Sequence, residues 1–284
     1  MPMRPALPLD STYRGRAIPL GGLRYWSWLF AAPDVRDALL GIYALGAEWR
    51  AQTAPATDRA VAHLKLAWWR EEIARLASGS PAHPVSRYLL ALPGAAMIDW
   101  SPLAAAIDAA DDEVGGVPIE TGGAVLPHAS ALWGGPLALA SRLTDPDADV
   151  RACTAPLAAG HYLSAALRDY RALARIGRVP FAVDELLAAG IDNADLCAAE
   201  APPALRRYLD TLRVRAAECY RSAGASLAHE RRGRHRHLLV LAALGLDRLR
   251  PVPEPRPARR EPPPAGRRLR DMLLAWKTAR GAQR

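Results

Sequence analysis

The feature that most restricts the fold of this chain is a helical hydrophobic period that runs through almost all of it. Long Ala- and Leu-rich segments repeat their apolar residues with a period of about 3.6. Helix-breaking residues separate these segments at Ser80-Pro81, Leu92-Pro93-Gly94 and Ala201-Pro202-Pro203. Alternating runs of β-branched residues, which are typical of half-buried strands, are absent from the sequence. The sequence therefore predicts an all-α protein.

The composition allows one large core, or one core with a small appendage, because 50% of the 284 residues are hydrophobic. No apolar run has membrane-spanning length, and the Pro-rich segment 1–20 does not resemble a signal peptide. The three cysteines are widely spaced, which favours neither a disulfide framework nor a zinc site. The basic residues are nearly all Arg, as in high-GC bacterial genes. We expect a cytoplasmic bacterial protein, with a peripheral position at the inner face of the membrane as the alternative.

The most specific pattern lies in the segment 160–186. A predicted helix carries Arg168 and Asp169, the chain turns through Gly177-Arg178-Val179, and Asp184-Glu185-Leu186 follows. This order resembles the second signature of the squalene/phytoene synthase family, which belongs to the isoprenoid synthase superfamily. In that signature a helix with N-x-x-R-D, and a second Asp four residues later, precedes G-R-V and a D-E-L segment.

Several acidic positions of the family are substituted in this chain. In the second signature, Ala165 replaces the Asn and Leu173 replaces the second Asp. An earlier predicted helix, after Pro33-Asp34, carries Tyr43-Ala44-Leu45 where the family has Y-A-F-C-R. The D-D-x-x-D cluster that should follow is missing, and Glu48 is the only carboxylate in that window. The residues at the expected acidic positions include Ala51, Gln52 and Pro55.

The helix predicted over residues 64–76, LKLAWWREEIARL, is also similar to a family stretch, K-L-x-W-W-R-E-E-L. The resemblance extends from about Leu23 to about Arg250. It implies an all-α, isoprenoid-synthase-like helical bundle with a central cavity, formed by residues 1–250. We expect a Pro- and Arg-rich linker at 251–266 and a basic amphipathic helix at 267–284 after it.

The resemblance also implies which chemistry is missing. The family ionises an allylic diphosphate with Mg²⁺ ions, which carboxylates one helical turn apart hold against the diphosphate oxygens. Since the second carboxylate is absent from each helix, we expect no catalytic residues and no metal or other cofactor. The losses are similar to those of the mitochondrial complex I assembly factor branch, whose A-E-x-A-Q-like stretch Glu48 and Gln52 match.

We therefore expect a catalytically degenerate protein that is an assembly or scaffolding factor with a protein partner. It would retain binding of an isoprenoid diphosphate or another lipid. The alternative is an active prenyltransferase that condenses two prenyl diphosphates head to head, giving squalene or phytoene, and that requires Mg²⁺. The candidate ligand-binding residues are Tyr43, Glu48, Arg168, Asp169, Arg171 and Arg178.

Arg168 has two interpretations. In the first, it is one half of a structural pair with Glu48 or Asp169 inside a polar slot of the bundle. In the second, Arg168 belongs to an arginine face with Arg171, Arg175 and Arg178, which binds a phosphate-bearing isoprenoid without metal. Arginine suits this role because its guanidinium group is a forked donor that is always charged. We expect two facing helices to line the cavity with Tyr43, Glu48, Arg168 and Asp169.

The segment 267–280 places Leu269, Met272, Leu273 and Trp276 on one helical face and basic residues elsewhere. One interpretation is a helix docked on the bundle with its basic residues in solvent. The other is a helix that lies on an anionic bilayer and makes a peripheral membrane contact. The net charge of +8 agrees with an anionic partner but does not distinguish these interpretations.

Two further charged patterns are assigned to solvent-exposed helix faces. Asp108, Asp111 and Asp112 share one face, with a divalent cation as the alternative. The segment 229–237, HERRGRHRH, is rich in Arg and His. Because no interleaved aromatic residues or known motif accompany it, we expect no nucleic-acid partner.

Overall fold

The computed structural model describes residues 9–54, 57–250 and 265–283 of the chain. Within these residues, β-structure is limited to one isolated bridge between Ile119 and Ala182, which confirms the predicted all-α class. The α-helices are α1 Ser11–Ala17, α2 Leu23–Leu29, α3 Arg36–Thr53, α4 Arg59–Ala77, α5 Pro84–Leu90, α6 Ser101–Gly115, α7 Val125–Ala129, α8 Gly135–Arg142, α9 Arg151–Ala174, α10 Val183–Ala189, α11 Asn193–Cys197, α12 Pro203–Ser226, α13 His229–Arg232, α14 Arg236–Arg248 and α15 Ala265–Gly281. Short 3₁₀ turns are η1 Pro33–Val35, η2 Ala95–Met97 and η3 Gly122–Ala124, and η4 Ser130–Gly134 is a π-helical turn.

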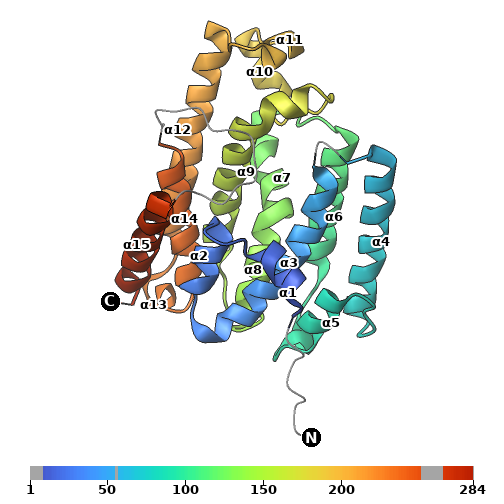
Figure 1. The fold of residues 1–284 in the computed structure, drawn as a ribbon, viewed down its shortest axis with the longest axis vertical. Coiled ribbons are helices and arrows are strands. Elements are labelled where there is room, and N and C mark those ends of the chain that lie inside the picture. The colour runs from blue at the N-terminus through green and yellow to red at the C-terminus, as the bar shows by residue number, and fades with distance from the viewer. Residues whose placement is uncertain (1–8, 55–56, 251–264, 284) are drawn as a thin grey trace, which may run out of the picture.

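The long helices run roughly along the long axis of the molecule and form a bundle (Figure 1). The central helix α9 packs against α12, and α12 packs against α14, which carries α15 on its outer side. On the opposite side of the bundle, α3 packs against α4 and α6. Helix α8 contacts both α3 and α9. Helices α3 and α9, which carry most of the predicted site residues, are therefore both interior elements.

The α7–η4–α8 segment is a nearly continuous helical rod. A Cβ atom on Gly134 would lie 3.2 Å from the backbone oxygen of Thr154 on α9. A Cβ atom on Gly135 would lie 3.1 Å from Cβ of Pro102 on α6. The two glycines therefore allow this rod to approach α9 and α6 closely, which brings Trp133 into the centre of the bundle.

Helix α4 contains the predicted tryptophan pair and a structural acid. Trp69 is buried in the core, whereas Trp68 is 40% exposed. Glu72 is fully buried, and its carboxylate accepts hydrogen bonds from the backbone N–H groups of Ala82 (3.0 Å) and His83 (2.7 Å). This acid therefore holds the segment before α5 against α4, because a buried carboxylate requires such partners.

Helix α15 docks on the bundle through a face of small residues. Ala275 and Ala279 pack into a hydrophobic cluster with Trp26, Val240 and Leu244 of α2 and α14. Of the predicted apolar face, Met272 packs against this cluster, whereas Leu269, Leu273 and Trp276 are exposed. Most of the predicted linker 251–266 lies outside the described residues. None of the described helices is long and apolar enough to cross a membrane.

Candidate functional site

Tyr43 lies on the buried face of α3 and joins α3 to α2. Its hydroxyl group is 3.0 Å from Ser27 Oγ, and Arg24 donates from Nη1 to its backbone oxygen at 3.4 Å. Burial raises the pKa of the Tyr43 hydroxyl to about 12. Since the hydroxyl therefore stays protonated at neutral pH, Tyr43 is a structural link and a hydrogen-bonding group.

Glu48 follows Tyr43 on α3 and is half-buried. Its Oε1 lies 3.0 Å from Nη2 of Arg16 on α1. Burial raises the pKa of Glu48 above its ordinary value, and the charge of Arg16 opposes this effect. Gln52, one turn further along, is buried and donates from Nε2 to the backbone oxygen of Glu48 at 3.0 Å. On this face of α3, the Glu48 carboxylate thus pairs with Arg16, and the side chain one turn later, Gln52, carries an amide.

Arg168 and Asp169 of α9 form a two-contact ion pair with each other. Arg168 Nε donates to Asp169 Oδ1 at 3.0 Å, and Nη2 donates to Oδ2 at 2.7 Å. Their side chains are 68% and 44% exposed, so the pair lies in contact with solvent and not in the enclosed polar slot that one interpretation expected. An exposed ion pair contributes only about 0–1 kcal/mol. A ligand with a higher negative charge than Asp169 can therefore compete for the Arg168 guanidinium group.

Of the predicted arginine face of Arg168, Arg171, Arg175 and Arg178, the last residue lies elsewhere. Helix α9 ends at Ala174, and Gly177 adopts a left-handed conformation with φ of 74°, which turns the chain away from the helix axis. Arg178 is buried and donates from Nη1 to the backbone oxygen of Thr53 at 3.0 Å. It therefore supports the C-terminal end of α3, where helix carbonyl groups lack internal partners. Arg171 remains on α9, half-buried, with its guanidinium group 5.6 Å from the ring centre of Tyr170.

His161, two turns before Arg168 on α9, lies in a strongly cationic environment. Its ring makes an edge-to-face contact with Trp133, with ring centres 5.4 Å apart. Burial, together with the charges of Arg168, Arg24 and Arg248, lowers the pKa of His161 to about 4. The imidazole is thus neutral at pH 7, and three guanidinium groups lie near enough to act on it. The sequence did not indicate Arg24 or Arg248, because each lies in a helix with no family motif.

Arg50 is a third arginine that the sequence did not indicate. Its guanidinium group lies 4.3 Å from the ring centre of Trp133, in a cation–π arrangement. Its Nη2 is buried and has no hydrogen-bond partner among the described residues. A buried donor without a partner is costly, so this position favours an anionic or polar ligand. The only sequence signal for Arg50 was its place on α3, one helical turn after Gly46.

A small void separates α3 from the η4–α8 segment. Its volume is about 20 Å³, and the lining residues are Ile42, Tyr43, Gly46, Trp49, Leu132, Trp133, Pro136 and Leu137. A space of this size holds about one water molecule. The expected central cavity is therefore narrow at this point, because the indole rings of Trp49 and Trp133 occupy the space between the helices.

The residues at the expected Mg²⁺ positions do not fit that ion. Leu173 and Ala51 offer no oxygen ligand on their side chains, and Gln52 is engaged with its own helix. Pro55 lies outside the described residues. In the described part of the chain, no group of three His, Cys, Asp or Glu side chains has an arrangement that suits a metal ion. The two remaining acids, Glu48 and Asp169, each contact an arginine.

The acids Asp184 and Glu185, which match the D-E-L segment of the family signature, connect structural elements. Glu185 accepts hydrogen bonds from Tyr208 Oη at 3.0 Å and from Arg215 Nη1 at 2.7 Å, both on α12. Asp184 accepts a hydrogen bond from the backbone N–H of Gly122 at 2.9 Å. These acids therefore fix α10 against α12 and η3, which gives a structural reason for this part of the resemblance.

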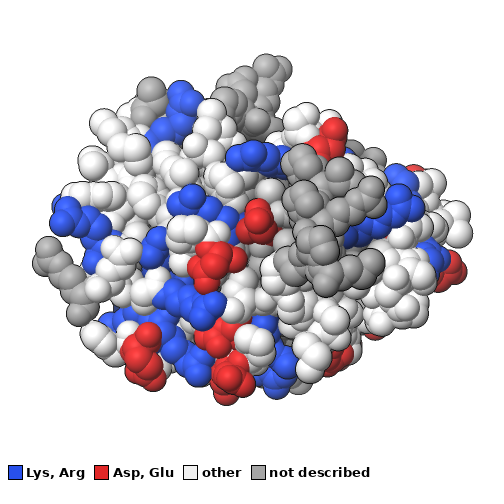
Figure 2. All heavy atoms as spheres, turned by 90° about the horizontal axis from the view of Figure 1, so that it is seen from below, with Lys and Arg blue, Asp and Glu red and all other residues white. Residues whose placement is uncertain are grey.

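The other charged patterns are occupied by ion pairs. On α6, Asp108 contacts Arg70 at 2.6 Å, and Asp111 lies 2.6 Å from His63. In the segment 229–237, Arg231 contacts Asp145 at 3.2 Å and Arg234 contacts Asp34 at 3.0 Å. Figure 2 shows the end of the molecule that carries α13, where acidic and basic side chains are interspersed on the visible surface.

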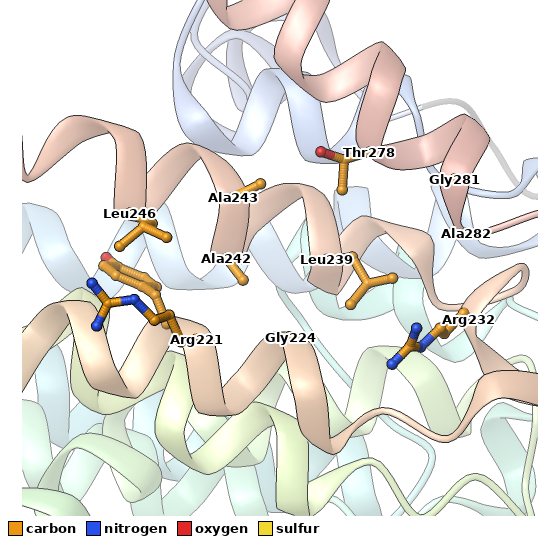
Figure 3. A pocket seen from close by; sticks show the side chains of 11 residues that line it. Arg221, Gly224, Arg232, Leu239, Ala242, Ala243, Leu246, Thr278, Gly281 and Ala282 are labelled. Atoms are coloured by element: carbon orange, nitrogen blue, oxygen red, sulfur yellow. The ribbon is translucent and has the colours of Figure 1, made fainter.

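A larger groove, of about 310 Å³, lies between α12, α14 and α15. Leu239, Ala242 and Leu246 of α14 form part of its apolar wall, and Arg221 and Arg232 lie at opposite ends (Figure 3). None of the predicted ligand-binding residues lines this groove.

Comparison with known proteins identifies the fold and the family. The family model for squalene/phytoene synthase matches residues 23–267. No curated protein sequence matches the chain. A crystal structure of a dehydrosqualene synthase in complex with ligand is similar with a TM-score of 0.70 and 15% identity, over 91% of this chain and 92% of that chain. A crystal structure of squalene synthase HpnC from Alicyclobacillus acidocaldarius is similar with a TM-score of 0.60 and 17% identity, over 98% of this chain and 97% of that chain.

Proposed function

Since this chain belongs to the squalene/phytoene synthase family, we propose that it is a non-catalytic member that binds an anionic isoprenoid and acts as an assembly or scaffolding protein. Members of the family are prenyltransferases, so in this proposal the fold is retained and the reaction is lost. The observation that carries the proposal is the pairing of both remaining carboxylates, Glu48 and Asp169, with arginines.

Loss of the metal changes how a diphosphate can be neutralised. In metal-dependent ionisation, Mg²⁺ stabilises the departing phosphate oxygens. A site without paired carboxylates cannot place such an ion against the leaving group, so the allylic bond is not activated in this way. Guanidinium groups still bind phosphate oxygens through two parallel hydrogen bonds. We therefore expect binding without turnover.

The proposed anion site comprises Arg24 and Arg168 near His161, and Arg50 on the ring of Trp133, which contacts His161. Arg24 is held by two backbone oxygens, at 3.4 Å each, and has no carboxylate partner among the described residues. Arg50 has a buried N–H without a partner in the described part of the chain, and Arg168 has only a weak surface pair. In this arrangement the diphosphate group binds first, and a prenyl chain enters only when Trp133 moves, because the void beside it is so small.

The assembly role rests on the same loss of acids. The family model matches residues 23–267, so nearly the whole bundle is retained without the acids that metal-dependent turnover requires. The retained bundle would then act through binding to a protein partner. The alternative, an active prenyltransferase, requires a metal site made of other residues.

Binding of farnesyl diphosphate, measured by titration calorimetry at low salt, tests this proposal. We expect the same dissociation constant with excess Mg²⁺ and with EDTA. We also expect Arg50→Gln to weaken binding on the order of 10-fold, because a charge-assisted hydrogen bond is lost. The matched control is Arg213→Gln, whose side chain pairs with Asp210 on the exposed face of α12; it should leave binding unchanged.

Two results would contradict the proposal. Binding that requires Mg²⁺ would show that the chain assembles a metal site after all. Equal affinities for the Arg50→Gln and Arg213→Gln variants would show that the cationic region around His161 is not the binding site.

A further inference from the structure

Helix α15 has two faces of different chemistry. The docked face consists of small or paired residues: Asp271, Ala275 and Ala279 are buried. Asp271 forms an ion pair with Arg248 of α14 at 2.9 Å. This face accounts for the position of the helix, since small side chains allow close approach and the ion pair fixes its register. Met272 and Leu274 also pack against this interface, whereas Leu269, Leu273 and Trp276 are exposed.

The opposite face of α15 exposes a stripe of large apolar side chains. Leu269, Leu273 and Trp276 are 55%, 47% and 43% exposed. Their spacing of four and three residues places them along one side of the helix. Single exposed apolar residues are ordinary on protein surfaces, and examples in the described chain are Leu187 on α10 and Val214 on α12. Helix α4 is the other helix with a row of three, Val61, Leu64 and Trp68, which are 43%, 72% and 40% exposed. The row on α15 forms a continuous apolar strip on a helix whose one acid, Asp271, is buried, whereas α4 exposes Glu71.

Basic side chains lie beside this stripe. The Arg280 guanidinium group is 4.8 Å from the ring centre of Trp276, and Lys277 is exposed next to it. Arg270, also exposed, reaches Asp247 at 2.6 Å. The chain as a whole carries a net charge of +8. An apolar strip with cations at its margin matches the surface of an anionic bilayer, where hydrocarbon lies below a layer of negative headgroups.

We propose that α15 is an interfacial helix that lies on an anionic membrane, with Leu269, Leu273 and Trp276 inserted at the level of the headgroups. Lys277 and Arg280 contact lipid phosphates, and the alanine face keeps the helix attached to the bundle. The helix does not need to leave its docked position, so the whole bundle is held at the membrane surface. This inference does not depend on the proposed isoprenoid site.

A second copy of the chain fits this face less well than a bilayer does. A two-fold symmetric interface brings the same patch of both copies together. Lys277 and Arg280 of one copy would then approach the equivalent cations of the other copy, and like charges in contact oppose association. The basic margin therefore favours a negatively charged partner.

Flotation of the full-length protein with vesicles tests the proposal. We expect binding to vesicles of phosphatidylcholine with phosphatidylglycerol, and much weaker binding to phosphatidylcholine alone. The double variant Leu273→Ser/Trp276→Ser should bind the anionic vesicles at least about 10-fold more weakly, because it removes most of the inserted apolar area. The control Leu187→Ser/Val214→Ser removes apolar residues from α10 and α12 that are more exposed, at 73% and 58%, and should bind as the unmodified protein does.

A charge variant keeps the test decisive if the serine variant folds poorly. Lys277→Glu/Arg280→Glu leaves the apolar stripe intact, and we expect it to lose the preference for anionic vesicles. The proposal is overturned if the unmodified protein does not float with anionic vesicles, or if both α15 variants float as well as the control. It is also overturned if light scattering shows a dimer that the serine variant converts to a monomer while vesicle binding is absent.

Discussion

The two carboxylates that remain at the site, Glu48 and Asp169, have different surroundings and the same kind of partner. Glu48 is half-buried beside Arg16, and Asp169 is open to solvent beside Arg168. The sequence showed which acids are missing, because that can be read from the motif. It could not show that an arginine of α1 reaches Glu48, since the contact depends on how α1 packs against α3.

His237 gives a prediction at the same scale. It is fully buried, its ring nitrogens have no partner among the described residues, and burial with the nearby charges of His235 and Arg236 lowers its pKa from 6.5 to about 3. Between these values the unfolded chain binds the proton and the folded chain does not, so acid favours unfolding. The free energy of unfolding should therefore fall by about 2 kcal/mol between pH 7 and pH 5 on account of His237.

Denaturant titrations at a series of pH values check this expectation. The His237→Gln variant should lose that part of the pH dependence, whatever its absolute stability. His229→Gln, at an exposed position on α13, should keep it. Parallel pH profiles for all three proteins would show that His237 does not titrate on unfolding.

The helices themselves were largely predictable, and their ends and contacts were not. The 3.6-residue period and the proline and glycine breaks indicated α3, α4 and α9. The face that Arg178 was expected to share with Arg168 fails because Gly177 reverses the chain after α9. For α15, the period identified an apolar face, but docking through alanines depends on the shape of α14 and α2, which no local pattern records.

The ion pair between Asp271 and Arg248 gives a prediction at the scale of this element. Asp271→Ala leaves the Arg248 guanidinium group without its carboxylate in a half-buried position, so we expect a loss of about 2–3 kcal/mol in the stability of α15 docking. Hydrogen exchange of peptides from α15 should become faster, while peptides from α4 and α6 should not change.

The control for this variant is Asp210→Ala on α12, whose pair with Arg213 is exposed. It should change the exchange of α15 by less than about 0.5 kcal/mol in apparent stability. Equal exchange of α15 in both variants would mean that the alanine face alone holds the helix.

At the scale of the whole molecule, the bundle of an isoprenoid synthase is kept while its centre differs. The fold was predictable because the family motifs extend over several helices, from α3 to α10. The centre was not, since Arg24, Arg50, Trp133 and His161 come from four separate elements that only the tertiary structure brings together. The family pattern has paired acids and an open cavity in this region. In this chain, arginines and indole rings occupy it. This difference is the basis for expecting binding without catalysis.

The most direct test of this account is a turnover assay with radiolabelled farnesyl or geranylgeranyl diphosphate and Mg²⁺. The expected acidic positions carry Ala51, Gln52 and Leu173, so we expect no squalene or phytoene above a control without protein. Clear Mg²⁺-dependent product formation by the unmodified protein, abolished by Asp169→Ala, would contradict it and would establish an active prenyltransferase.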